Sequence, residues 1–198
     1  MTALPLGITQ PDARSCGAAS LVAARMLLDP TYAELVTAGA HPRTGFALAG
    51  GTVHERFGYE TLAMHRRVTG AAVLGGGVQL PWPRMIGTPP WAVAHQLSRT
   101  GGPGLPPTPY DVSLVRLHPG ASGPMVRAGL RTGRPVAVFV GDAWLPRHVV
   151  LSVGLSGDSV DCYDPARGRV VAAGTSAFAE QRLPFGRWTT AWFVVAPA

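Results

Sequence analysis

Hydrophobic runs in the last third of the chain predict an antiparallel β-sheet. Five short segments rich in β-branched and aromatic residues follow one another there, and turn-forming residues separate them. Runs of this composition between glycine, proline and aspartate signals are typical of strands. The five segments are residues 135–140, 148–155, 159–164, 169–173 and 191–197. The pattern therefore predicts a sheet over about residues 134–198.

The first forty residues have a helical pattern instead. Residues 16–28 place apolar side chains along one side of a helix, and Ser15 is in position to cap its first turn. The side chains predicted to be buried are Leu21, Val22, Met26 and Leu28. A second short helix is predicted at residues 31–39, where Gly39 ends it.

The middle of the chain, about residues 40–133, is less regular. We predict one helix around residues 53–68 and another at 91–99, which begins after a threonine and two prolines. Residues 81–109 hold eight of the 19 prolines, so most of this stretch is predicted to be loop. The order of helices and then strands predicts one α+β domain over residues 1–198, helical over about 1–133 and sheet over about 134–198.

Composition limits the partners of the chain. It has 198 residues, of which 46% are hydrophobic and 14% charged, so it can build one core. Neither a run of 18 apolar residues nor a signal peptide is present, so we expect no membrane segment and a cytoplasmic location. All 17 basic residues are arginine, and the net charge is +6. Because the arginines are dispersed and form no stripe interleaved with aromatic residues, we expect no nucleic-acid partner.

Two cysteines stand in different contexts. Cys16 opens the first predicted helix, where the positive end of the helix dipole favours a thiolate. Cys162 lies inside a predicted strand and is expected to be a buried, unreactive thiol. Cysteine and histidine are not clustered at metal-ligand spacing, and no cofactor motif is present, so we expect neither a metal nor a cofactor.

A histidine and an aspartate are predicted to meet at one rim of the sheet. Of the six histidines, only His148 stands at the start of a strong strand, and Asp164 ends the next strand. If the turn between them is the three-residue segment 156–158, Asp164 pairs with Val150 and shares a face with His148. A two-residue turn would put the two side chains on opposite faces. The other histidines, at positions 41, 54, 65, 95 and 118, are expected to be surface or packing residues.

Two further side chains complete the predicted site. Gln10 lies six residues before Cys16, where its amide could form an oxyanion hole with the backbone N–H of Cys16. The five tryptophans are expected mostly in the core, but Trp144 lies four residues before His148 and is a candidate for a wall of the cleft. Cys16, His148, Asp164 and Gln10 therefore form a candidate catalytic set for nucleophilic acyl transfer.

The segments QPDARSCGAAS and HVVLSVGLSGDSVDCYDPARG together resemble the papain-like cysteine peptidases. The nearest branch is the one that trims double-glycine leaders from bacteriocin precursors, with its free-standing relatives. The resemblance covers about residues 6–38 and 133–197. It implies a papain-like fold, in which the helix carrying the cysteine packs on a C-terminal antiparallel sheet. It also implies the order Gln, Cys-Gly, His and Asp-Pro, which Gln10, Cys16, His148 and Asp164 match.

The resemblance implies a peptidase that cleaves a peptide or protein through a thioester, with leader processing as one such task. A transporter would then be a candidate partner, although no residue here supports it. The residues leave two alternatives open. The same acyl-enzyme would serve an acyltransferase, a deamidase or a transglutaminase-type toxin, and a catalytically inactive binding module could keep the same fold.

Overall fold

The computed structural model describes residues 4–71, 80–102 and 104–198. Its helices are α1 (Cys16–Leu28), α2 (Pro30–Ala38), α3 (Val53–Thr69), the short 3-10 helix η1 (Arg84–Ile86), α4 (Pro90–Ser98), α5 (Pro119–Arg131) and α6 (Thr175–Ala179). Its strands are β1 (Tyr110–Leu114), β2 (Val136–Gly141), β3 (Pro146–Ser156), β4 (Ser159–Asp164), β5 (Arg169–Gly174) and β6 (Thr190–Pro197). The fold class is α+β, as the sequence predicts.

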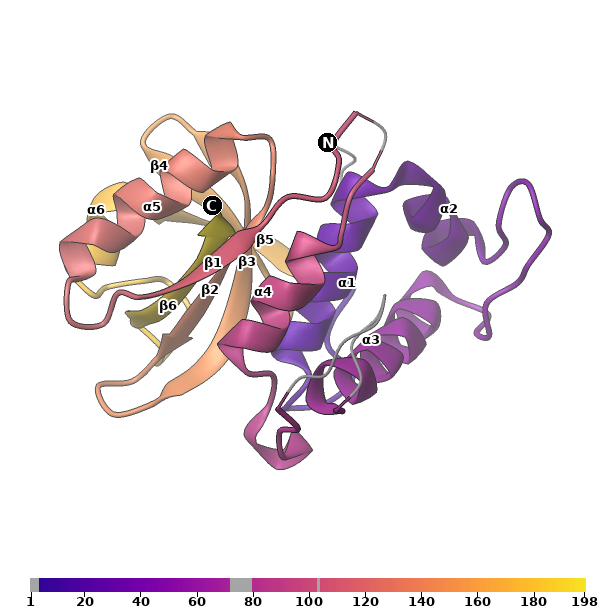
Figure 1. Ribbon diagram of the computed structural model, residues 1–198, viewed down its shortest axis with the longest axis horizontal. Coiled ribbons are helices and arrows are strands. Elements are labelled where there is room, and N and C mark those ends of the chain that lie inside the picture. The colour runs from indigo at the N-terminus through magenta and orange to yellow at the C-terminus, as the bar shows by residue number, and fades with distance from the viewer. Residues whose placement is uncertain (1–3, 72–79, 103) are drawn as a thin grey trace.

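The strands form one antiparallel sheet in the order β1-β6-β2-β3-β4-β5. Helices α1 to α4 cover one face, and α5 and α6 cover the other (Figure 1). Alternate residues of the central strand β2 contribute to the two cores, with Phe139 on the α1 side and Val138 and Val140 on the α5 side. Because β2 is buried on both faces, its sequence is apolar throughout and does not alternate with polar residues.

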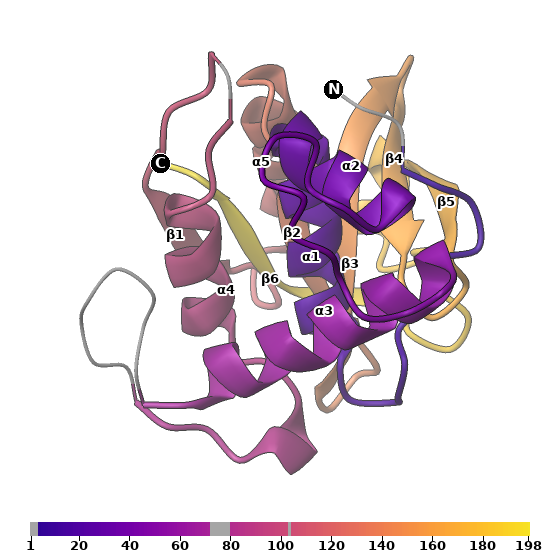
Figure 2. The same ribbon diagram turned by 90° about the vertical axis from the view of Figure 1, so that its right-hand side faces the viewer.

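Helix α1 lies at the centre of the molecule. It packs against β3 and against α2, α3 and α4 (Figure 2). All of its residues are buried except Arg25, whose guanidinium lies over the ring of Tyr32 at 3.9 Å. The sequence predicts burial of one side of this helix only. Small side chains on its other sides let three helices approach closely, so the whole helix is covered.

Local signals explain where the other N-terminal helices begin and end. Asp29 caps α2 by accepting a hydrogen bond from the N–H of Tyr32, and Gly39 ends it in the left-handed conformation with φ 89°. Thr52 and Glu55 form a reciprocal capping box at the start of α3. The helices predicted around residues 53–68 and 91–99 are both present, as α3 and α4.

The division into a helical part before residue 133 and a sheet after it is wrong in detail. Strand β1 comes from the middle of the chain and pairs with β6 at the sheet edge, and α6 lies within the sheet region. Nor does the sequence predict helix α5, because this segment contains three glycines and an internal Pro124, which disfavour a helix. It forms because Val126 and Leu130 are buried in the core on this face of the sheet. Among the described residues, no helix is long and apolar enough to cross a membrane.

Candidate active site

The start of α1 presents Cys16 at an uncapped helix end. Ser15 occupies the N-cap position, but its side chain makes no capping bond, and its hydroxyl donates to the carbonyl of Asp12 instead. The predicted Ser15 cap is therefore wrong. The first N–H groups of α1 lack a side-chain acceptor, so the positive end of the helix acts on the Cys16 thiol. The next residue is a glycine because no side chain fits there. A Cβ on Gly17 would lie 2.7 Å from the Cβ of Thr88.

Strands β3 and β4 bring His148 and Asp164 to one rim in the predicted register, since Leu151 pairs with Tyr163, but the turn between the strands is not the predicted one. Ser156 pairs with Ser159, so the turn has two residues rather than three. Such a turn alone would place the two side chains on opposite faces of the sheet. A β-bulge at Val153 adds one residue to β3 and shifts the register by one. The bulge therefore restores the shared face that the predicted turn would have given.

The imidazole of His148 donates from Nε2 to Oδ1 of Asp164 at 2.8 Å. Both side chains are buried, with only 2% and 3% of their surface exposed. Oδ1 also accepts the N–H of Ala166 at 3.0 Å, and Oδ2 lies 3.5 Å from Nε of Arg167. Burial opposes ionisation of Asp164, but these bonds and charges hold the pKa of its carboxyl below the ordinary value.

The charged form of His148 is favoured at neutral pH. Burial disfavours the imidazolium, but the hydrogen bonds to Asp164 and Cys16 and the negative charge available on each raise the pKa of His148 to about 9. Trp188 stacks on the ring, with 4.7 Å between ring centroids and 28° between planes. The indole covers one face of the imidazole, so it limits rotation of the ring and excludes water from that side.

Gln10 lies beside this group but is not aimed into the cleft. Its Nε2 donates to the carbonyl of Asp12 at 2.6 Å, and its backbone N–H donates to the carbonyl of Pro165 at 2.8 Å. Neighbouring bonds from Gly7 and Tyr163 also tie the N-terminal segment to the end of β4 and the turn after it. These contacts indicate that Gln10 holds the segment before Cys16 in place. Its second amide hydrogen has no such bond, and the oxyanion role stays a prediction.

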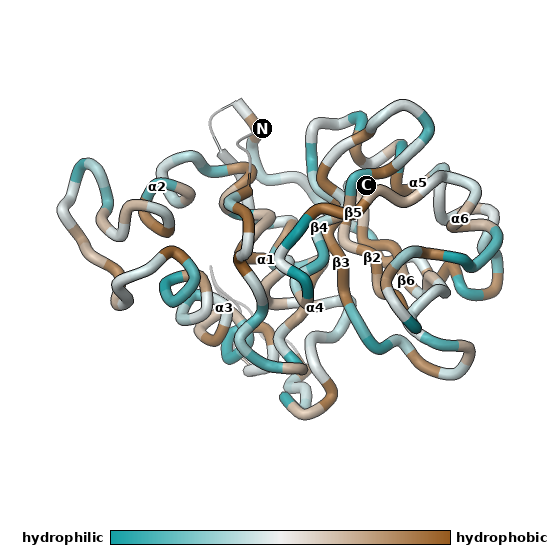
Figure 3. The backbone as a smooth tube through the Cα atoms, turned by 180° about the vertical axis from the view of Figure 1, so that it is seen from behind, coloured by the Kyte–Doolittle hydropathy of each residue, from teal (hydrophilic) through white to brown (hydrophobic). Residues whose placement is uncertain are grey.

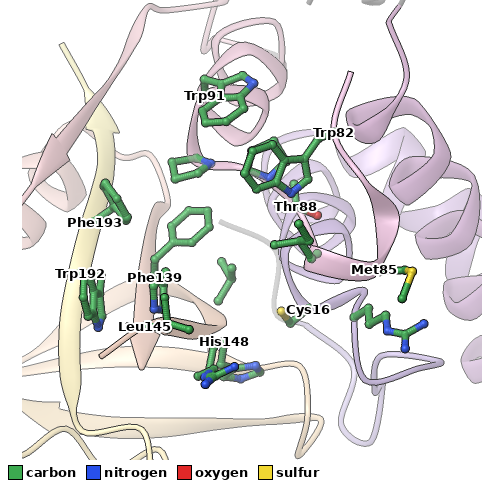
Figure 4. Close-up of a pocket in the computed structure, with 18 of the residues that line it drawn as sticks. Cys16, Trp82, Met85, Thr88, Trp91, Phe139, Leu145, His148, Trp192 and Phe193 are labelled. Carbon is green, nitrogen blue, oxygen red and sulfur yellow. The ribbon is translucent and has the colours of Figure 1, made fainter. Parts of the chain in front are cut away.

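A cleft of about 800 Å³ opens at the catalytic pair. Figure 4 shows Cys16 and His148 at one end of the cleft, with Trp82 and Trp91 at the other and Trp192 at the side. The lining residues are Ala13, Arg14, Cys16, Trp82, Met85, Ile86, Gly87, Thr88, Pro89, Pro90, Trp91, Val112, Phe139, Leu145, Pro146, Arg147, His148, Val149, Trp192 and Phe193. Trp82 and Trp91 meet edge to face at 5.0 Å between ring centroids. The cleft is therefore mostly apolar beside its reactive end.

Trp144 does not line the cleft, so the expectation that it forms a wall is wrong. Its side chain is 82% exposed at the tip of the β2–β3 loop, while Leu145 beside it lines the cleft. The wall is built from Trp82 and Trp91 of the proline-rich stretch and from Trp192 of β6. Part of the proline-rich stretch 81–109 therefore forms a wall of the cleft, where Pro89 and Pro90 lie beside η1.

The remaining cysteine and histidines lie apart from this group. Cys162 is fully buried beside Ser152, and burial raises the pKa of its thiol to about 12. None of His41, His54, His65, His95 and His118 lines the cleft. Within residues 4–71, 80–102 and 104–198, no group of three or more His, Cys, Asp or Glu side chains could hold a metal ion.

Sequence reasoning missed three residues of the site. Trp188 and Thr88 come from loops whose place in the fold no local pattern reveals. The contact of Arg167 could have been predicted from the sequence, because Arg167 lies three residues after Asp164 in a tight turn and can reach back to the carboxylate.

Comparison with known proteins adds no relative. No protein-family model matches the chain, and no curated protein matches it closely enough to count as a relative.

Proposed function

We propose that the chain is a papain-like cysteine peptidase that cleaves a peptide or protein substrate through a thioester acyl-enzyme. One observation carries the proposal. A buried imidazole held by Asp164 interacts with the side chain of Cys16, at an uncapped helix start that opens on a large cleft (Figure 4). The papain-like fold is part of the proposal. It is supported by the central helix that begins at the cysteine and packs on the antiparallel sheet.

The raised pKa of His148 supports a reaction in which the imidazolium assists the Cys16 sulfur. Since the pKa of His148 is raised to about 9, the ring is protonated at neutral pH and can stabilise a thiolate on Cys16. The sulfur attacks the carbonyl carbon of the substrate, and the carbonyl oxygen becomes an oxyanion. His148 then gives its proton to the leaving amine as the C–N bond breaks, which leaves a thioester on Cys16. Water, deprotonated by His148, attacks the thioester and releases the acid product and the free thiol.

The oxyanion would meet the N–H groups at the start of α1. The N–H of Cys16 is a suitable donor, because no side chain caps this helix end. The second amide hydrogen of Gln10 is the candidate side-chain donor. Asp164 holds the ring so that Nδ1 of His148 can face the sulfur, since Nε2 is bonded to the carboxylate.

Labelling with an electrophilic peptide probe tests this proposal. The wild-type protein is expected to form a covalent adduct on Cys16, and Cys16→Ala is expected to form none. Cys162→Ala is the matched control and should label like the wild type, because that thiol is buried in the opposite core. An adduct that persists in Cys16→Ala, or its absence from the wild type, would contradict the proposal.

The mass of the products separates peptidase activity from the related reactions. Hydrolysis of a backbone amide gives two shorter peptides, whereas deamidation of a glutamine side chain raises the mass by about 1 Da. Transfer to an amine gives a product that carries both substrates. We expect two shorter peptides from a protein substrate, and intact substrate with only the 1-Da gain would replace the peptidase with a deamidase.

A further inference from the structure

Two exposed apolar tips flank the mouth of the cleft. Met85 and Ile86 of η1 are 73% and 66% exposed, and Trp144 and Leu145 of the β2–β3 loop are 82% and 50% exposed. We call these four residues the apolar rim. The two segments lie on the lower side of the molecule in Figures 1 and 2, and the lowest part of the tube in Figure 3 includes stretches coloured hydrophobic. Large exposed apolar side chains on two tips beside one cleft indicate an interaction surface.

The β2–β3 tip is held in its exposed position. Oδ1 of Asp142 accepts the N–H groups of Trp144 and Leu145 at 2.8 Å and 2.9 Å. The carbonyl of Asp142 in turn accepts Nε1–H of Trp192, on the neighbouring strand β6. The loop therefore presents an indole to solvent from an ordered turn. Binding through such a turn costs little conformational entropy, because the turn is already formed.

The charges around the apolar rim are mainly positive. The arginines are Arg14 and Arg147, which line the cleft, Arg84 in η1, and Arg116, which donates to the β2–β3 loop. The aspartates in these segments are Asp12, which accepts a hydrogen bond within its own loop, and Asp142, which pairs with Arg147 at 3.3 Å. No Asp or Glu of the described residues lines the cleft. The rim thus combines apolar tips with a surplus of guanidinium groups, on a chain of net charge +6.

We propose that the apolar rim docks the protein on an anionic lipid surface, with the mouth of the cleft facing the membrane. Protruding tryptophan, leucine and isoleucine side chains bordered by arginine suit the interface between lipid headgroups and acyl chains. Arginines near an anionic membrane add about 1 kcal/mol of attraction each. A protein partner would favour one continuous patch, whereas these side chains stand on two separate tips. The docking requires no catalysis, so it stands apart from the proposed peptidase activity.

Sedimentation with lipid vesicles tests the docking. Wild-type protein is expected to sediment with vesicles of phosphatidylcholine and phosphatidylglycerol, and much less with phosphatidylcholine alone. Met85→Ser/Ile86→Ser and Trp144→Ser/Leu145→Ser should each weaken this binding on the order of tenfold, because they remove apolar area from the interface.

Two further variants make the test specific. Arg84→Gln should weaken binding about fivefold, and added salt should weaken the wild type as well. Phe46→Ser is the matched control, because Phe46 is 62% exposed but lies in the α2–α3 loop, away from the rim. Equal binding to both kinds of vesicle, no binding to either, or an equal loss in Phe46→Ser would overturn the proposal. If the rim variants instead abolish self-association of the protein in solution, the rim is a contact between copies of the chain.

Discussion

Replacing Asp164 by Asn tests how the carboxylate acts on His148. The amide oxygen of Asn can still accept the Nε2–H of His148, so the ring orientation is kept while the negative charge is lost. The pKa of His148 is raised from 6.5 to about 9 in the folded protein, and the hydrogen bond and charge of Asp164 contribute to that rise. Because the active form needs the imidazolium, the alkaline limb of the rate profile should follow this pKa.

The size of the effect depends on the pH of the assay. Loss of a neighbouring opposite charge lowers a pKa by about 1–3 units, so we take about 1.5 units for the Asn variant. At pH 7 the imidazolium fraction then falls from nearly all to about three quarters, a loss of less than about twofold. At pH 8.5 it falls from about three quarters to about a tenth, a loss of about eightfold. Asp164→Ala should lose more at every pH, because the ring is also free to rotate.

The assay is the pH dependence of kcat/KM for the wild type, Asp164→Asn and Asp164→Ala. Circular dichroism at each pH controls for unfolding. An alkaline limb that stays at the same pH in both variants would refute the reasoning, and Asp164 would then be a strand-ending turn residue beside a Cys16–His148 dyad.

Three more substitutions probe the neighbours of the catalytic pair. Arg167→Met should move the alkaline limb to higher pH, opposite to Asp164→Asn, because the carboxylate is then less neutralised; kcat/KM profiles measure this, and Arg167→Lys should restore the wild-type limb. Gln10→Ala should lower kcat about 10²-fold with little change in KM if Gln10 is an oxyanion donor, whereas a lower melting temperature with unchanged kcat would leave it only a bracing role. Gly17→Ala should destabilise the fold by about 1–3 kcal/mol in urea titration, because the added methyl collides with Thr88. The second substitution Thr88→Gly should recover part of that loss, and no recovery would contradict the contact.

The sequence predicts the parts of the fold that local signals determine. The helix after Cys16, the Gly39 stop and the five later strands all follow from periodicity, capping or turn residues. Helix α5 and strand β1 cannot be predicted from local signals. Tertiary burial stabilises α5 despite its glycines, and β1 forms by pairing with the distant strand β6. Long-range pairing of this kind is not encoded in a local pattern.

The candidate site shows the same division. Cys16, His148 and Asp164 could be selected because each stands at the end of a predicted element, where rigid backbone meets the cleft. His148 and Asp164 share a face of the sheet because of a bulge at Val153. No local sequence pattern predicts this bulge, so the physical reason for the shared face could not be predicted. The stacking of Trp188 on the imidazole is likewise a product of packing between distant segments.

The alkylation rate of Cys16 at pH 6 tests the central claim most directly. At this pH an ordinary thiol is only about 0.3% thiolate, so fast reaction requires a partner that stabilises the charge. Iodoacetamide labelling followed by peptide mapping gives the separate rates of Cys16 and Cys162 in the wild type and in His148→Ala. We predict that Cys16 reacts at least about 30-fold faster in the wild type than in the variant, with Cys162 slow in both. Equal rates for Cys16 in the two proteins, or labelling of Cys162 as fast as Cys16, would contradict a thiolate–imidazolium pair at this site.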